Sequence, residues 1–220
     1  MKFLYISTGN RYPPDKHLID GLRENGHGVF ELIENGRGFG KYISFTGNFL
    51  KENRSCDAII VGFTLPLLVP IVRLFSRRKV IFNAISSQYE ANIVSRNTDG
   101  PWSLAALKWW FMDFLSFHLS SLVLLESNAQ VNFTHKLFLV PKNKLIKSWM
   151  GVDEEVFFRD FNIKKKQEFT VLFRGRFLPE SGILTVIEAA KKLENKGVWF
   201  LIFGHGFMYR EVNAIMEELK

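Results

Sequence analysis

The feature of this 220-residue chain that most restricts its fold is a series of short, uncharged apolar runs. Ala58-Ile59-Ile60-Val61 and Val123-Leu124-Leu125 contain no polar side chain. A half-exposed strand alternates apolar with polar residues, so continuous runs are typical of strands covered on both faces, as in parallel sheets. We predict strands at residues 2–7, 28–33, 58–63, 79–85, 122–126, 145–149, 169–174 and 198–203.

Segments with helical periodicity lie between several of these runs. An apolar stripe follows Asp15 and stops at Asn25-Gly26, which is a common way for a helix to end. Further helices are predicted at residues 102–119, 128–138, 183–193 and 208–219. Strands that alternate with helices indicate an α/β fold with a parallel sheet.

The most polar run, Lys164-Lys165-Lys166-Gln167, has no clear periodicity and marks a linker at residues 161–168. The linker separates a predicted Rossmann-like N-terminal domain at 1–160 from the first part of a second Rossmann-like domain at 169–220. That second part offers two strands and two helices, which is half of a doubly wound domain. We therefore expect the chain to end inside its second domain.

Charge is unevenly distributed along the chain. The whole formal excess of +7 lies in the first 166 residues, where Arg77-Arg78-Lys79 are adjacent. This asymmetry suits an anionic partner such as a membrane surface, a lipid phosphate or a nucleic acid, but solvated charges without a partner would give the same pattern. Because no nucleic-acid-binding module is recognisable, we do not expect a nucleic acid partner.

Neither of the two longest apolar segments predicts a transmembrane helix. Residues 58–72 contain two prolines, and residues 101–125 are interrupted by Lys108, Asp113 and His118. The apolar run at the N-terminus is also too short for a secretory signal. We expect a cytoplasmic protein that can attach peripherally to the inner face of the membrane.

Metal and cofactor chemistry finds no support in the sequence. Cys56 is the only cysteine, and the five histidines lack metal-site spacing. The glycine-rich segment 36–40 does not connect a strand to a helix in the order that a phosphate loop requires. We expect no metal and no cofactor. We expect Trp109-Trp110-Phe111 to pack in the core, and contact with lipid or with an acceptor is the alternative.

The strongest local signal is Gly175-Arg176, which directly follows the predicted strand at 169–174 and precedes a loop and a helix. Ligands of doubly wound sheets bind outside the carboxyl ends of the strands. There a glycine lets the backbone approach a phosphate, an arginine can fork onto it, and a helix N-terminus adds positive potential. An ordinary strand-to-helix turn is the alternative interpretation.

This segment resembles the start of the second domain in GT-B-fold glycosyltransferases of the large retaining group 1 type. In that family a Gly-Arg pair follows the strand and a Pro-Glu-Lys-Gly turn leads into the helix. Other segments resemble family motifs in the same order along the chain. They are the opening unit 1–32 with Gly9 and Asn25-Gly26-His27-Gly28-Val29, the run Ser87-Gln88-Tyr89-Glu90 with Arg96, the signature Trp149-Met150-Gly151-Val152-Asp153, and the strand with loop at 198–206.

The resemblance implies a transferase that moves a sugar from a nucleotide-sugar to an acceptor, which could be a polysaccharide, a lipid-linked glycan or a small molecule. The first domain would bind the acceptor and the second the nucleotide-sugar. Gly175 and Arg176 would bind the donor phosphates. Gly9, Ser87, Tyr89 and Arg96 are candidates for the acceptor side of the cleft, and no catalytic residue is assigned.

The chain also departs from the family pattern. Ser181 stands where the family has a lysine that resembles a donor-phosphate ligand, and residues 83–86 lack the family's histidine. Its pair of glutamates separated by seven residues would lie beyond Lys220, so we expect the chain alone to be inactive. A different GT-B enzyme such as a sugar-nucleotide epimerase, and a non-catalytic partner subunit, remain as alternatives.

Overall fold

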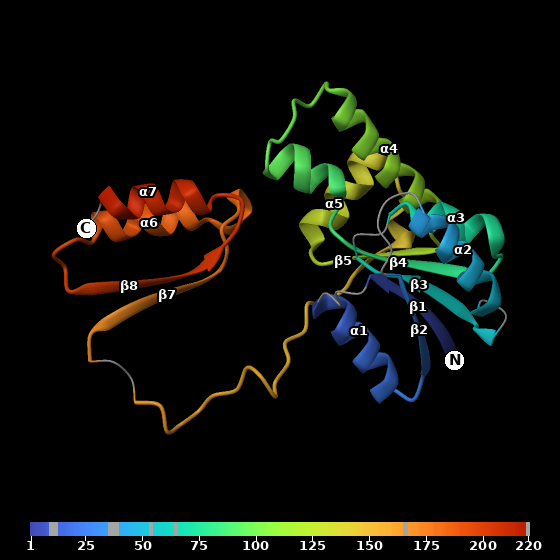
Figure 1. Cartoon of the computed structure of the whole chain (residues 1–220), viewed down its shortest axis with the longest axis horizontal. Coiled ribbons are helices and arrows are strands. Elements are labelled where there is room, and N and C mark those ends of the chain that lie inside the picture. Colours follow the sequence, from blue (N-terminus) through green and yellow to red (C-terminus); the bar gives the residue numbers. More distant parts are fainter. Residues whose placement is uncertain (9–12, 35–39, 53–54, 64–65, 165–166, 219–220) are drawn as a thin grey trace. The chain divides into compact units, whose positions relative to one another are not determined.

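The computed structural model describes residues 1–8, 13–34, 40–52, 55–63, 66–164 and 167–218 (Figure 1). The chain divides into two compact units. The first comprises Met1–Ile93 and Asp99–Phe157, and the second comprises Val94–Thr98 and Phe158–Lys220. The main boundary between them lies close to the predicted end of the first domain at residue 160.

The first unit is built on a six-stranded sheet in which every neighbouring pair is parallel. The order across the sheet is β2-β1-β3-β4-β5-β6, so the direction of winding reverses between β1 and β3. This confirms the predicted α/β, Rossmann-like architecture. The strands are β1 (Lys2–Thr8), β2 (Gly28–Glu34), β3 (Ala58–Val61), β4 (Lys79–Ile85), β5 (Leu122–Leu125) and β6 (Leu145–Lys147).

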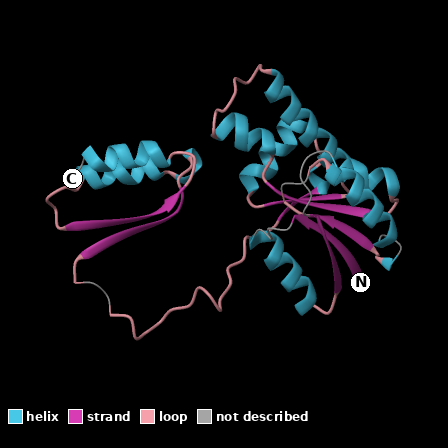
Figure 2. Cartoon of the chain, viewed as in Figure 1, coloured by secondary structure: helices cyan, strands magenta, loops and turns pink. Residues whose placement is uncertain are grey.

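Helices cover both faces of this sheet (Figure 2). They are α1 (Pro13–Glu24), α2 (Gly40–Glu52), α3 (Leu68–Phe75), α4 (Leu104–Leu119) and α5 (Asn128–Phe138), with a short π-helix at Glu90–Ser95 and a 3-10 turn at Lys142–Lys144. Among the described residues, no helix combines the length and apolar character that crossing a bilayer requires.

Alternation along β1 divides the buried side chains between two cores. Phe3 and Tyr5 pack with Ile19 of α1 on one face of the sheet. Leu4 and Ile6 point to the other face, where they join the larger core beneath α2, α3, α4 and α5. Because successive strand residues face opposite sides, β1 needs apolar residues at each of positions 3 to 6, where the two cores meet it.

The second unit contains two parallel strands with two helices on one of their faces (Figure 2). Its elements are β7 (Phe169–Arg176), a 3-10 turn at Pro179–Ser181, α6 (Ile183–Lys192), β8 (Val198–His205) and α7 (Tyr209–Glu218). Phe177, Ile183, Ile187, Met208 and Val212 form its buried core. The predicted strand–helix–strand–helix order is confirmed.

Candidate functional site

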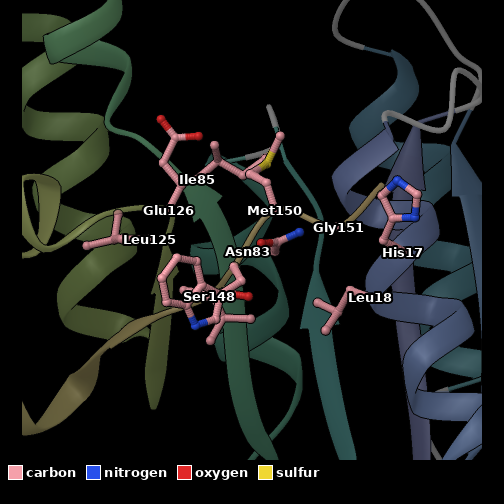
Figure 3. Close-up of a pocket in the computed structure, with 11 residues that line it drawn as sticks. His17, Leu18, Asn83, Ile85, Leu125, Glu126, Ser148, Met150 and Gly151 are labelled. Atoms are coloured by element: carbon pink, nitrogen blue, oxygen red, sulfur yellow. The ribbon is translucent and has the colours of Figure 1, made fainter. Parts of the chain in front are cut away.

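A cavity of about 190 Å³ opens in the first unit at the carboxyl ends of β4, β5 and β6, beside α1. Figure 3 shows Asn83 near its centre, Glu126 and Ile85 on one side, and His17 and Leu18 of α1 on the other. Ligand cavities in doubly wound sheets lie at this edge. The volume is below the roughly 300–1,000 Å³ of drug-sized sites, so it suits a ligand about as large as one sugar ring.

The backbone is strained where β4 enters the cavity. Ile85 has φ 63°, in the left-handed region that a β-branched residue rarely occupies. The ladder between β4 and β5 shifts here, and the Glu126 amide donates to the Ile85 carbonyl oxygen at 3.1 Å. Backbone strain of this kind clusters at binding and catalytic sites, because it is retained only where the surrounding structure enforces it.

A buried carboxylate holds the floor of this region together. Asp15 of α1 accepts hydrogen bonds from Tyr5 Oη at 2.5 Å, Asn83 Nδ2 at 2.9 Å and the Phe63 amide at 3.2 Å. It thereby links α1 to β1, β4 and the end of β3. Burial raises the pKa of Asp15, whereas its three hydrogen bonds act to lower it.

Gly62 leaves the space that this carboxylate occupies. A Cβ at residue 62 would lie 2.9 Å from the Ile6 carbonyl oxygen and 3.0 Å from Asp15 Oδ2.

The Asn83 side-chain nitrogen already donates hydrogen bonds to Asp15 and, at 3.3 Å, to the Tyr5 hydroxyl oxygen. The Asn83 carbonyl oxygen is therefore the group of this side chain that can accept a hydrogen bond from a ligand.

Glu126 gives the cavity its negative charge. It follows β5, lines the cavity, and accepts a hydrogen bond from Gln130 Nε2 at 3.1 Å. Burial, followed by the charge of Glu126, raises the pKa of Glu90. Within the described part of the chain, Glu90 Oε2 is buried without a hydrogen-bond partner. The Glu126 carboxylate in the lining, with Glu90 nearby, favours a hydroxyl-bearing ligand here over a phosphate.

The segment that follows β6 lines the cavity with residues 148–151 and is tied to α1. Lys16 of α1 pairs with Asp153 at 2.5 Å, and Gly151 lies against the His17 ring, which a Cβ there would approach to 3.3 Å. The Lys147 ammonium lies 3.3 Å from the centre of the exposed Trp149 ring. Two residues of the sequence motif at 149–153, Gly151 and Asp153, therefore have a structural role, because both contact α1.

The acceptor-side candidates have structural partners. Ser87 Oγ is buried and accepts from the Glu90 amide at 2.9 Å, so it caps the π-helix. The Tyr89 ring packs edge-on against Phe138 beside the larger core. Neither side chain lines the cavity. Arg96 belongs to the second unit and donates to Glu180 at 3.0 and 3.2 Å, and Gly9 lies outside the described residues.

Asp113 of α4 is a buried carboxyl that accepts a hydrogen bond from the Tyr89 amide at 2.8 Å. Burial raises its pKa to about 7. A carboxyl whose pKa is higher in the folded than in the unfolded state stabilises the fold at low pH, and this contribution is lost as the pH rises through the folded pKa.

We therefore expect the free energy of unfolding of the first unit to fall by about 2–3 kcal/mol between pH 5 and pH 8 through Asp113. Asp113→Asn keeps an acceptor for the Tyr89 amide but does not titrate, so it should flatten this dependence. Urea unfolding followed by circular dichroism at both pH values measures the difference. Equal pH dependence in the two proteins would contradict the assignment to Asp113.

In the second unit, Gly175 and Arg176 stand at the end of β7, in register with Gly204 and His205 of β8. Gly204 and Gly206 have a packing role. A Cβ at Gly204 would collide with the Gly175 carbonyl oxygen, and one at Gly206 would lie 2.6 Å from the Phe177 carbonyl oxygen. Gly175 has room for a methyl group, because its nearest neighbour would be the Phe173 ring at 3.4 Å.

The N-terminus of α6 follows the same strand end. Gly182 begins the helix with φ 70°, and no side chain caps the free amides. The Ser181 hydroxyl donates to the Leu178 carbonyl oxygen at 2.7 Å and does not cap α6. Uncapped amides at a helix N-terminus attract anions.

Residues that sequence reasoning missed include His17, Asn83 and Glu126 at the cavity. Glu126 could have been identified from the sequence, since it is a charged residue directly after an uncharged apolar run, and Arg176 was identified by a similar position at a strand end.

Among the described residues, no group of three or more His, Cys, Asp or Glu side chains is arranged to hold a metal ion. A scan of the chain against models of protein families returns no match, and a search among curated proteins also returns none.

Proposed function

We propose that this chain acts in glycosyl transfer, as part of a retaining GT-B enzyme that moves a sugar from a nucleotide-sugar to a hydroxyl-bearing acceptor. In this proposal the end of β7 in the second unit binds the donor diphosphate, and the cavity of the first unit binds the acceptor. Two α/β units with polar groups at the carboxyl ends of parallel strands support it, because ligands of such sheets bind there.

The observation that carries the proposal is the glycine at position 175. Packing explains Gly204 and Gly206, but Gly175 could hold a methyl group without displacing any neighbour. A glycine that the fold does not require, placed next to an arginine and followed by an uncapped helix, suits close approach of a phosphate to the backbone.

Each group at the two sites has a chemical task in this proposal. Arg176 and the first amides of α6 would bind the diphosphate more strongly as it gains charge during departure from the sugar. In the first unit, Glu126 and the Asn83 carbonyl oxygen would accept hydrogen bonds from acceptor hydroxyls. The exposed Trp149 ring offers an apolar face for a sugar ring.

Arg176→Ala is expected to weaken nucleotide-sugar binding at least about tenfold, since a charge-assisted hydrogen bond contributes roughly 1.5–3 kcal/mol. Arg174→Ala is a matched control, because Arg174 is an exposed arginine on the same face of the same strand. Calorimetric titration with uridine, guanosine and adenosine diphosphate sugars measures both variants. Equal affinities for Arg176→Ala and the unmodified chain would contradict the donor-site assignment.

A further inference from the structure

The outer side of α4 carries an apolar stripe that the core does not use. The exposed fractions are 87% for Leu104, 62% for Leu107 and 55% for Phe111, and Trp102, two residues before the helix, is 98% exposed. Leu104, Leu107 and Phe111 follow a spacing of three and four residues, which places them on one side of the helix. The expectation that Trp109-Trp110-Phe111 packs in the core is therefore wrong for Phe111, although Trp110 does stack on Phe138.

The opposite side of α4 supplies the contacts that the fold needs. Ala106, Asp113, Ser116 and Phe117 are buried there. The helix is apolar nearly all round because it has two apolar sides, and only one of them faces the core. Single exposed apolar residues are ordinary, whereas a continuous stripe of large ones marks a surface that contacts a membrane or another protein.

Basic side chains on α4 and beyond the end of α3 favour an anionic partner for this side of the unit. Lys108 is exposed on α4, and the only acidic residue of the helix, Asp113, is buried. The adjacent helix α3 packs against α4 and exposes Leu74 and Phe75. No acidic residue occurs between Asp57 and Glu90, a stretch that contains Arg73, Arg77, Arg78 and Lys79. These basic residues lie from the last turn of α3 to the start of β4, beside the C-terminal end of α4, where the Ser121 amide donates to the Val80 carbonyl oxygen.

We propose that α3 and α4 form a surface that binds an anionic lipid bilayer, with Trp102, Leu107 and Phe111 inserted among the headgroups. Tryptophan favours the interface between lipid and water, and basic side chains are attracted to anionic headgroups over about 10 Å. The described helices are too short or too polar to cross a bilayer, so the attachment is peripheral. This goes beyond the proposed function and does not depend on it.

The test is co-sedimentation of the whole chain with vesicles of phosphatidylcholine, with and without phosphatidylglycerol, at low salt. The chain should bind the anionic vesicles, and Leu107→Ser with Phe111→Ser should weaken binding at least about tenfold. Arg77→Gln with Lys79→Gln should weaken it roughly fivefold for each charge removed. Phe158→Ser with Phe161→Ser is the matched control, because these exposed rings lie outside α3 and α4, and it should bind as the unmodified chain does.

Three results would overturn the proposal. The first is a chain that stays in the supernatant with both vesicle types, and the second is a Leu107→Ser/Phe111→Ser variant that sediments like the unmodified chain. The third is a dimer in gel filtration that this variant converts to a monomer, which would assign the surface to self-association. Because the vesicles contain no nucleotide-sugar and no sugar acceptor, none of these outcomes tests the proposed transferase function.

Discussion

Replacing Asp15 by alanine is expected to lower the free energy of unfolding of the first unit by at least about 3 kcal/mol. The change would leave the Tyr5 hydroxyl and the Asn83 amide without their shared acceptor in a buried site, and would remove the hydrogen bond from the Phe63 amide. Each buried polar group that loses its partner costs about 1–3 kcal/mol, and the removed side chain also leaves a small void. Urea unfolding at pH 7 measures the effect.

Asp20→Ala provides the comparison on the same helix. Asp20 is only half-buried, so its loss should change the free energy of unfolding by less than about 0.5 kcal/mol. A cost for Asp15→Ala no larger than that for Asp20→Ala would mean that the three hydrogen bonds do not hold α1 against the sheet.

Gly204→Ala is expected to unfold or severely destabilise the second unit, by about 3 kcal/mol or more. The added methyl group would meet the Gly175 carbonyl oxygen on the neighbouring strand and would lie 2.5 Å from the buried Phe177 ring. Backbone on one side and a core ring on the other leave no route for relaxation. Hydrogen exchange of β7 and β8 amides reports the loss of stability of this unit directly.

Gly175→Ala separates packing from ligand binding at the same pair of strands. Its methyl group fits, so amide protection should stay within about 1 kcal/mol of the unmodified chain. Similar loss of protection in both variants would show that the two glycines have the same structural role, and the support that Gly175 gives to a donor site would disappear.

Strand positions were predictable because burial on both faces forces an uncharged run, as at Ala58–Val61. Other elements were harder to predict, and α2 and the π-helix show why. The helix Gly40–Glu52 packs only through Phe45 and Phe49 among its described buried residues, which is too short a stripe to stand out in sequence. The π-helix at Glu90–Ser95 is held by Ser87 and by the α4 residue Asp113, a long-range contact that local sequence does not contain.

The two candidate sites also differed in how far the sequence could predict them. Gly175 and Arg176 are adjacent in sequence at a strand end, so a local pattern could identify them. The cavity of the first unit combines α1, β4, β5 and the segment 148–151, which only the order of the parallel sheet brings together. Asp15 was predictable as a residue near a helix start, but its role as a shared acceptor for two strands was not.

The measurement that tests the central proposal most directly is amide chemical-shift mapping of the whole chain during titration with nucleoside diphosphate sugars. We expect at least one of these donors to shift the amides of Gly175, Arg176 and the first turn of α6, and Gly175→Ala to weaken this response while the strands stay protected. A donor that binds elsewhere, or no shift at these amides with any of the sugars, would contradict the assignment of β7 and α6 as the nucleotide-sugar site.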